Sequence, residues 1–266
     1  MEDPSLHIGE LKEQNRWIIR WIRNKYPAVS LEKEKYNNKK FFSSMSSIGH
    51  QEVIIETNEH EKDFSNYDIK HIVKLLKVYR SRLNEILRMP AVKYVCLFKN
   101  FGPDSGASII HSHSQIFALT KIPEFVKEEI NAAKKYKECP FCSIVKLEKN
   151  SERFAYENKS FIAICPFAPR FSLEVWILPK KHKKSMNDFT DAELIDLAEI
   201  LKYIIIRIDS SYNFYLHYSP AAKDNFHLHF EVTPRNSIWA GFEIGFGRYI
   251  VSTSPEEAAF FYRRKK

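Results

Sequence analysis

The sequence predicts an α+β protein made of two copies of one unit, each an antiparallel sheet packed by a helix. Residues 52–60 and 174–182 are nine-residue runs of strand-forming residues that end in histidine, and residues 63–77 align without a gap with residues 188–202. Later in each copy histidines recur at i and i+2, as His111 and His113 and again as His227 and His229. Three matches in the same order indicate a duplication.

The copies are expected to divide the chain into an N-terminal half, residues 1–125, and a C-terminal half, residues 126–266. Each aligned helix segment carries a residue that can cap a helix, Ser65 or Thr190, followed by apolar residues at helical spacing. The join is placed near residues 121–150, a charged segment that precedes the second copy as a loop.

Bulk composition narrows the class of protein. The chain has 266 residues, 44% of them hydrophobic, and a formal net charge of +8. No apolar run has the length of a bilayer span, and the N-terminal residues lack the pattern of a signal peptide. We therefore expect a cytoplasmic protein with no membrane partner. The positive charge suggests an anionic partner, and a nucleotide phosphate fits better than nucleic acid.

The first histidine pair lies in an apolar run, residues 108–119, as His-Ser-His-Ser-Gln. In a strand His111, His113 and Gln115 project to one side, about 6.5 Å apart, and the β-branched residues around them favour a strand. The glycine- and serine-rich residues 98–108 upstream can turn N–H groups and the Ser108 hydroxyl toward an anion. A nucleophilic or metal-binding role and a purely structural polar strand are both compatible with this pattern.

The second pair has different neighbours. Phe226, Leu228, Phe230 and Val232 alternate with the histidines as an apolar face, and no glycine-rich loop precedes them. This pair is a better candidate for metal than for a nucleophile.

Cys139 and Cys142 form a CxxC pair whose thiolates can reach one tetrahedral ion. His182 and His227 are available as the other two ligands, with His229 as a substitute. A redox pair and two unrelated buried cysteines are the competing interpretations. The redox interpretation is disfavoured because the pair is expected to follow a charged loop rather than a strand.

Taken together, these residues resemble the galactose-1-phosphate uridylyltransferase family of the histidine-triad superfamily, nearest its ADP-glucose phosphorylase-like branch. The likeness covers most of the chain from about Asn15 to Glu257. Its most specific part is the run from Phe98 to Gln115, which matches the family's active-site loop and strand and includes Gly106. The CxxC pair, His182 and His227 match the family's second-half zinc site, and residues 240–247 match its hexose-facing motif.

The resemblance implies a double-displacement reaction. His113 would attack the α-phosphorus of a nucleoside diphosphate hexose, release hexose 1-phosphate and pass the nucleotidyl group to a second phosphate, with His111 beside it. It further implies that the phosphoryl group is contacted by Asn100, Ser108 and Gln115, the base by Asn24 and the sugar by Glu243. One structural zinc ion and a homodimer are implied as well.

The chain departs from the family pattern near its start. Many members carry an earlier CxxC pair that completes a zinc site with the positions of His50 and His111, and no cysteine precedes Cys96 here. We predict that this first metal site is absent and that both histidines form hydrogen bonds instead. A uridylyltransferase, an ADP-glucose phosphorylase, a nucleotide hydrolase and a non-catalytic nucleotide-binding protein remain the alternatives.

Overall fold

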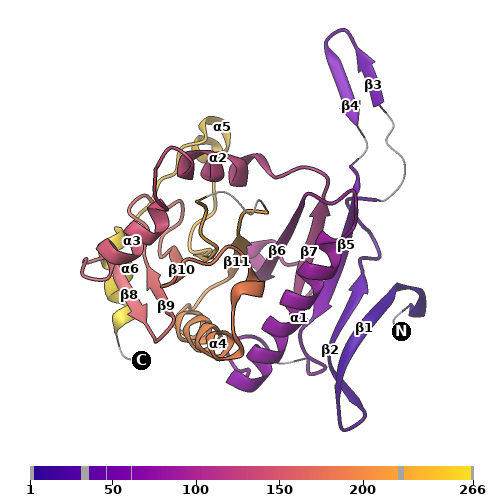
Figure 1. The fold of residues 1–266 in the computed structure, drawn as a ribbon, viewed down its shortest axis with the longest axis horizontal. Helices are drawn as coiled ribbons and strands as arrows, with labels where there is room; N and C mark the ends of the chain where they lie inside the picture. The colour runs from indigo at the N-terminus through magenta and orange to yellow at the C-terminus, as the bar shows by residue number, and fades with distance from the viewer. Residues whose placement is uncertain (1–2, 31–35, 46, 61, 221–224, 265–266) are drawn as a thin grey trace.

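The computed structural model describes residues 3–30, 36–45, 47–60, 62–220 and 225–264, and a ten-stranded antiparallel sheet dominates it (Figure 1). The strand order is β1-β2-β5-β7-β6-β11-β12-β10-β9-β8, and a hairpin of β3 and β4 projects from the body (Figure 1). The strands are β1 (His7–Glu13), β2 (Arg16–Arg23), β3 (Tyr36–Lys39), β4 (Phe42–Met45), β5 (Gly49–Ile55), β6 (Tyr94–Phe101), β7 (His113–Leu119), β8 (Phe154–Glu157), β9 (Phe161–Ile164), β10 (Val175–Pro179), β11 (Tyr212–His217) and β12 (His229–Pro234). The helices are α1 (Ile69–Leu87), α2 (Glu124–Ala133), α3 (Pro140–Glu148), α4 (Asp191–Ile205), α5 (Gly241–Phe246) and α6 (Pro255–Arg263), with short 3₁₀ turns η1 (Pro4–Leu6), η2 (Pro103–Ser105) and η3 (Met186–Asp188).

The strand order has the symmetry expected of a duplication. It is unchanged if β1, β2, β5, β7 and β6 are exchanged with β8, β9, β10, β12 and β11. The halves meet where β6 pairs with β11, with Phe101 opposite Tyr212, so they share one continuous sheet. The predicted α+β class with antiparallel sheet and helices is confirmed. The boundary between residues 125 and 126 falls in the first turn of α2 and stays a prediction.

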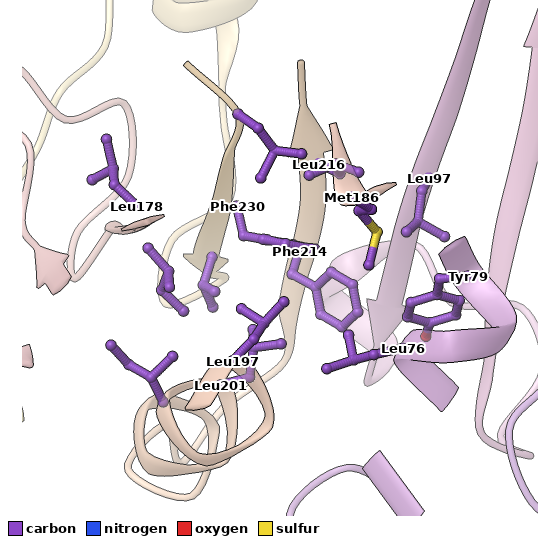
Figure 2. Packing of buried hydrophobic residues seen from close by; sticks show 14 of the residues in the cluster. Leu76, Tyr79, Leu97, Leu178, Met186, Leu197, Leu201, Phe214, Leu216 and Phe230 are labelled. Atoms are coloured by element: carbon purple, nitrogen blue, oxygen red, sulfur yellow. The ribbon is translucent and has the colours of Figure 1, made fainter. Parts of the chain in front are cut away.

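One face of the sheet carries the main core. Helices α1 and α4 lie side by side on it (Figure 1). Leu76 of α1 and Leu197 of α4 converge on Phe214 and Phe230 of the central strands, and all four are at most 1% exposed (Figure 2). In β7 Ile116 and Ala118 belong to this core, and because strand side chains alternate, His113 and Gln115 face the opposite side of the sheet.

Two local predictions were wrong. Thr190 caps α4 in a capping box with Glu193, as expected, but Ser65 does not cap α1, which begins three residues later in the alignment with Asp68 as its cap. Ser65 instead donates its hydroxyl to Asp63 Oδ1, in a turn before the helix. The charged join is also helical, because the apolar residues of α2 recur at helical spacing and are buried. None of the described helices has the length and hydrophobicity that crossing a bilayer requires.

Candidate active site and metal centre

A glycine-hinged loop connects β6 to β7. Gly102 and Gly106 both have φ of +81°, a left-handed conformation that side chains with a Cβ rarely adopt. A Cβ on Gly102 would also lie 2.4 Å from Ser211 Oγ. The two turns reverse the chain so that residues 107–112 pass beside the start of β7. Ile109, Ile110 and His111 were expected in the strand but lie in this loop before β7, and the two isoleucines are 60% and 99% exposed.

Inside the loop is a cavity of about 330 Å³, lined by residues 99–103 and 107–113. Among the described residues, the backbone N–H groups of Ala107, Ser108, Ile109 and Ile110 have no protein acceptor. A row of free N–H groups on a concave surface is suited to binding an anion. Ser108, Asn100 and His111, all predicted from the sequence, line the same cavity.

His113 is the first residue of β7 and lines the cavity while only 8% exposed. Its Nδ1 lies 2.8 Å from the main-chain oxygen of His111. A carbonyl oxygen only accepts, so Nδ1 carries the proton and Nε2 keeps its lone pair. The ring is therefore held in the tautomer that a nucleophile at Nε2 needs.

The other predicted substrate contacts are more scattered. Gln115 lies two residues further on the face of His113, but it and Gly106 are outside the lining of the cavity. Asn24 lies after β2, where its Oδ1 accepts a hydrogen bond from the N–H of Tyr26. Glu243 lies in α5, where its carboxylate accepts from the N–H of Ala240. Within one chain, the structure joins four of the predicted residues in the cavity.

A polar network on the core side of the sheet supports the start of β7. Lys99, 1% exposed, donates from Nζ to Glu56 Oε2 at 2.7 Å, to Ser112 Oγ at 2.9 Å and to the main-chain oxygen of His113 at 3.2 Å. Tyr79 on α1 donates to Glu56 Oε1 at 3.0 Å. Burial alone would raise the pKa of Glu56, but the charge and hydrogen bond of Lys99 outweigh it and lower that pKa. Sequence reasoning missed this network, although a lysine at a core-facing position of β6 marks it.

The predicted metal ligands do converge. The ligand atoms of Cys139, Cys142, His182 and His227 all lie within 4.8 Å of one another. Cys142 Sγ is 3.5 Å from Nδ1 of both histidines, and Cys139 Sγ is 3.9 Å from Nδ1 of His227. A zinc tetrahedron with bonds of about 2.3 Å to sulfur and 2.0 Å to nitrogen has sulfur–nitrogen edges of about 3.5 Å, so the group fits a metal such as zinc.

The protonation of this cluster also suits a cation. Burial raises the pKa of Cys142, and the neighbouring Cys139 raises it further, to about 11. The second effect arises because two thiolates repel each other when no cation lies between them. Burial, with His182 and His229 adding to it, lowers the pKa of His227 to about 3, so its ring is neutral and can coordinate a metal. Cys139 is at the N-cap position of α3 and follows the charged residues 134–138, so the pair follows a charged loop rather than a strand, as expected, and opens a helix.

His229 does not serve as a substitute ligand. Its Nε2 lies 3.4 Å from Glu231 Oε1, in a second cluster that includes Glu129 and His217 and whose ligand atoms lie within 4.8 Å of one another. In that cluster Glu231 also accepts a hydrogen bond from Arg170. A guanidinium in direct contact with Glu231 disfavours a further cation, so we assign this cluster as a network of ion pairs.

The hydrogen bonds predicted for His50 and His111 are both present, but with separate partners: His111 Nε2 lies 2.7 Å from the main-chain oxygen of Thr57. His50 does not lie beside His111: its Nε2 contacts Glu52 Oε1 at 2.7 Å. In the β5–β7 register His50 is opposite Ala118, near the far end of β7 from His111. His60 takes that place instead, with its Nδ1 2.9 Å from His111 Nδ1. The alignment of residues 52–60 with 174–182 already paired His60 with His182, a signal that the prediction overlooked.

A duplicated antiparallel α+β unit, with a histidine at a cavity wall whose Nδ1–H is held by a main-chain carbonyl, is the arrangement of a protein of the histidine-triad class. The C-terminal domain model of galactose-1-phosphate uridylyltransferase matches residues 97–247, more than half of the chain, and the N-terminal domain model of DUF4931, a domain of unknown function, matches residues 34–122. The chain belongs to the galactose-1-phosphate uridylyltransferase family.

Individual relatives support this membership. The chain is 33% identical to the ADP-glucose phosphorylase of Arabidopsis thaliana over 91% of its own length and 73% of the relative's. It is 30% identical to the galactose-1-phosphate uridylyltransferase of Thermotoga maritima, over 77% of its own length and 66% of that protein's. The crystal structure of the Arabidopsis phosphorylase with bound ADP-glucose superposes with a TM-score of 0.88 and 28% identity, covering 98% of this chain and 86% of that one.

Proposed function

We propose that this protein transfers a nucleoside monophosphate from a nucleoside diphosphate hexose to a phosphate or sugar phosphate through a nucleotidyl-histidine at His113. The observation that carries the proposal is the His113 ring, whose Nδ1–H is fixed on the His111 carbonyl while Nε2 is left available beside the cavity. Relatives named for both reactions support this class of substrate.

In the first half-reaction His113 Nε2 forms a bond to the α-phosphorus. The bond from that phosphorus to the bridging oxygen breaks, and hexose 1-phosphate leaves with the electron pair. The imidazolium that results keeps its Nδ1 proton on the carbonyl of His111. In the second half-reaction an acceptor phosphate oxygen attacks the same phosphorus, and the P–N electron pair returns to Nε2. The same N–H donors of residues 107–110 stabilise both transition states.

The acceptor is inorganic phosphate if the protein follows its phosphorylase relative, and a hexose 1-phosphate if it follows the uridylyltransferases. The phosphorylase reaction is favoured by the phosphorylase relative's higher identity and coverage, 33% over 91% of this chain against 30% over 77% for the uridylyltransferase. Incubation with ADP-glucose or UDP-glucose labelled in the α-phosphate is expected to leave acid-labile label on the wild-type protein and none on His113→Ala. Release of the nucleoside monophosphate at the same rate without any phosphate acceptor would identify a hydrolase instead.

The two cysteines and two histidines of the cluster are proposed to hold one structural zinc ion. Four protein ligands leave no open position, so the metal would supply folding stability rather than chemistry. We expect Cys139→Ser to lose one metal per chain and to lower the midpoint of thermal unfolding. Cys96→Ser, outside the cluster, is the control, and equal metal content in Cys139→Ser and wild type would contradict the assignment.

Glu243 is proposed to reach the hexose of a second copy in a homodimer. No residue of its helix α5 lines the His113 cavity, and α5 exposes Ile244 and Phe246, which are 74% and 75% exposed. We expect His113→Ala and Glu243→Ala each to lose transfer activity when assayed alone. Unfolded and refolded together, they would regain part of it, since a mixed dimer contains one intact site. No recovery from a mixture that is dimeric by light scattering would rule out a shared site.

A further inference from the structure

The side-chain amides of Gln115 and Asn100, which are assigned to the phosphoryl group, each accept a hydrogen bond from a second side-chain amide. We propose that Gln51 and Asn213 are positioning residues, which turn the amides of Gln115 and Asn100 so that their N–H groups face the transferred phosphoryl group. The inference rests on the proposed function, and it deepens that function by assigning an orientation to two of its donors.

The Gln51 amide is oriented by the main chain. The N–H of Ala28 donates to Gln51 Oε1 at 2.8 Å, and because a backbone N–H can only donate, that side of the amide must be its oxygen. The Gln51 NH₂ group therefore points the other way, to Gln115 Oε1 at 3.3 Å. With its oxygen engaged, Gln115 presents its own NH₂ group outward. Gln51 is 5% exposed, so little water competes for these bonds.

The Asn213 amide is oriented by a main-chain acceptor rather than by a main-chain donor. Its Nδ2 donates to the main-chain oxygen of Ser105 at 3.0 Å, and a carbonyl oxygen can only accept. The same NH₂ group donates to Asn100 Oδ1 at 2.8 Å, while Arg235 donates to Asn213 Oδ1 at 3.4 Å. Asn100 lines the His113 cavity, and with its oxygen engaged it too is left with an NH₂ group to offer.

The orientation matters because the oxygens of a transferring phosphoryl group only accept hydrogen bonds. An amide turned by half a rotation would place its oxygen against them and repel the developing charge. The supporting amides also connect distant parts of the chain to the site. Gln51 accepts at its main-chain oxygen from Asn24 in the predicted base segment, and Asn213 lies in β11 of the second half.

The experiment compares two replacements of Gln51 at pH 8. Gln51→Glu keeps the shape and still accepts from Ala28, but its second carboxylate oxygen also accepts, so Gln115 would turn its NH₂ group away from the substrate. Gln51→Met removes both bonds and leaves Gln115 free to rotate. We expect kcat to fall about 100-fold in Gln51→Glu and about 10-fold in Gln51→Met, with KM for the nucleotide sugar within about threefold of wild type.

A Gln115→Ala background separates orientation from simple charge repulsion. Adding Gln51→Glu to Gln115→Ala is expected to cost nothing further in kcat, whereas repulsion between the introduced carboxylate and the substrate would persist. Asn213→Asp and Asn213→Leu are expected to follow the same order, acting through Asn100. A larger loss in Gln51→Met than in Gln51→Glu, or a loss that persists without Gln115, would overturn the inference.

Failure of the inference can be told from failure of the proposed function. Wild-type protein that forms no labelled histidine from either donor removes the function and the inference together. Wild type that transfers, with His113→Ala inactive and Gln51→Glu equal to wild type in kcat, removes the inference alone.

Discussion

The two copies of the duplicated unit hold their second histidine in the same local way and use it differently. His113 Nδ1 lies 2.8 Å from the carbonyl of His111, and His229 Nδ1 lies 3.0 Å from the carbonyl of His227. Yet His113 lines a cavity, while His229 is fully buried between aromatic rings, with Phe141 stacked at 5.0 Å. The local chain fixes the tautomer, and the surroundings decide whether the other nitrogen can reach a substrate.

The core-facing side chains around the two histidine strands, β7 and β12, differ as well. In the first half Glu56, Lys99 and Ser114 form the buried polar network. The alignment and strand register place Leu178, Leu216 and Phe230 at the matching positions, all of them at most 2% exposed (Figure 2). A hydrocarbon core stabilises a strand without fixing individual main-chain atoms, whereas the hydrogen bond from Lys99 to the main-chain oxygen of His113 does fix one. The copy that carries chemistry is the one with polar support.

The largest expected difference between the halves is in catalysis. His113→Ala should lower nucleotidyl transfer on the order of 10³-fold or more with little change in thermal unfolding, because it removes the nucleophile from a cavity wall. His229→Gln should do the reverse, lowering stability while the folded fraction keeps its kcat. Both are measured by steady-state kinetics normalised to folded protein from circular dichroism. Equal kinetic losses in the two variants would mean that the halves are not divided in this way.

Removing one partner of the buried Lys99–Glu56 ion pair should lower the free energy of unfolding substantially. Lys99→Met leaves the Glu56 carboxylate buried without its cation, and we expect it to lower the free energy of unfolding by about 3–5 kcal/mol in urea denaturation. Lys99→Met combined with Glu56→Gln should recover much of that loss, since the uncompensated charge is gone.

Leu216→Met at the matching position of the second half is the control for Lys99→Met, with an expected cost below about 1.5 kcal/mol. A Lys99→Met variant as stable as Leu216→Met would show that the ion pair is not a stabilising feature of the first half.

Stability should depend on pH through the second half. Burial would lower the pKa of His217, but Glu231 and Glu129 outweigh it and raise that pKa to about 9, from 6.5 in the unfolded chain. A raised pKa stabilises the fold fully below pH 6.5, and this stability is lost as the pH rises through 9. On the order of 3 kcal/mol should therefore disappear between pH 6.5 and pH 9.5 in urea titrations. In the first half the uncharged Asn100 holds the matching position.

His217→Gln should flatten this pH dependence, whereas His7→Gln in β1 should leave it as in wild type. If the free energy of unfolding of His217→Gln still falls steeply as the pH rises, the titrating group must be a different residue.

The smallest expected effects concern the helix starts. Asp68→Ala and Thr190→Ala should each cost about 1 kcal/mol of unfolding free energy, because each removes the side-chain cap of its helix. Ser65→Ala, at the position aligned with Thr190, should cost less than about 0.5 kcal/mol, because Ser65 caps nothing. Equal losses of unfolding free energy in Ser65→Ala and Thr190→Ala would indicate that Ser65 caps α1, as the sequence alignment predicted and the structure contradicts.

Patterns of spacing predicted much of this molecule. The i and i+2 histidines, the CxxC pair with His182 and His227, and the nine-residue repeats were all found from residue type and separation along the chain. The errors at the site came where a residue's role depends on a partner far away in sequence. His60 was not considered for the place beside His111, and Gln51 and Lys99 went unnoticed, because their partners lie 13 to 64 residues away.

The sequence by itself determined the duplicated α+β architecture, the family and the identity of the histidine at the cavity, since these are carried by local periodicity and by motifs contiguous in the chain. Only the tertiary structure decided which copy keeps an open cavity, which copy closes around an ion-pair network, and which amides and buried charges support the site. Those outcomes depend on donors, acceptors and charges that folding brings together, and a hydrogen bond or an ion pair between distant residues leaves no period in the sequence.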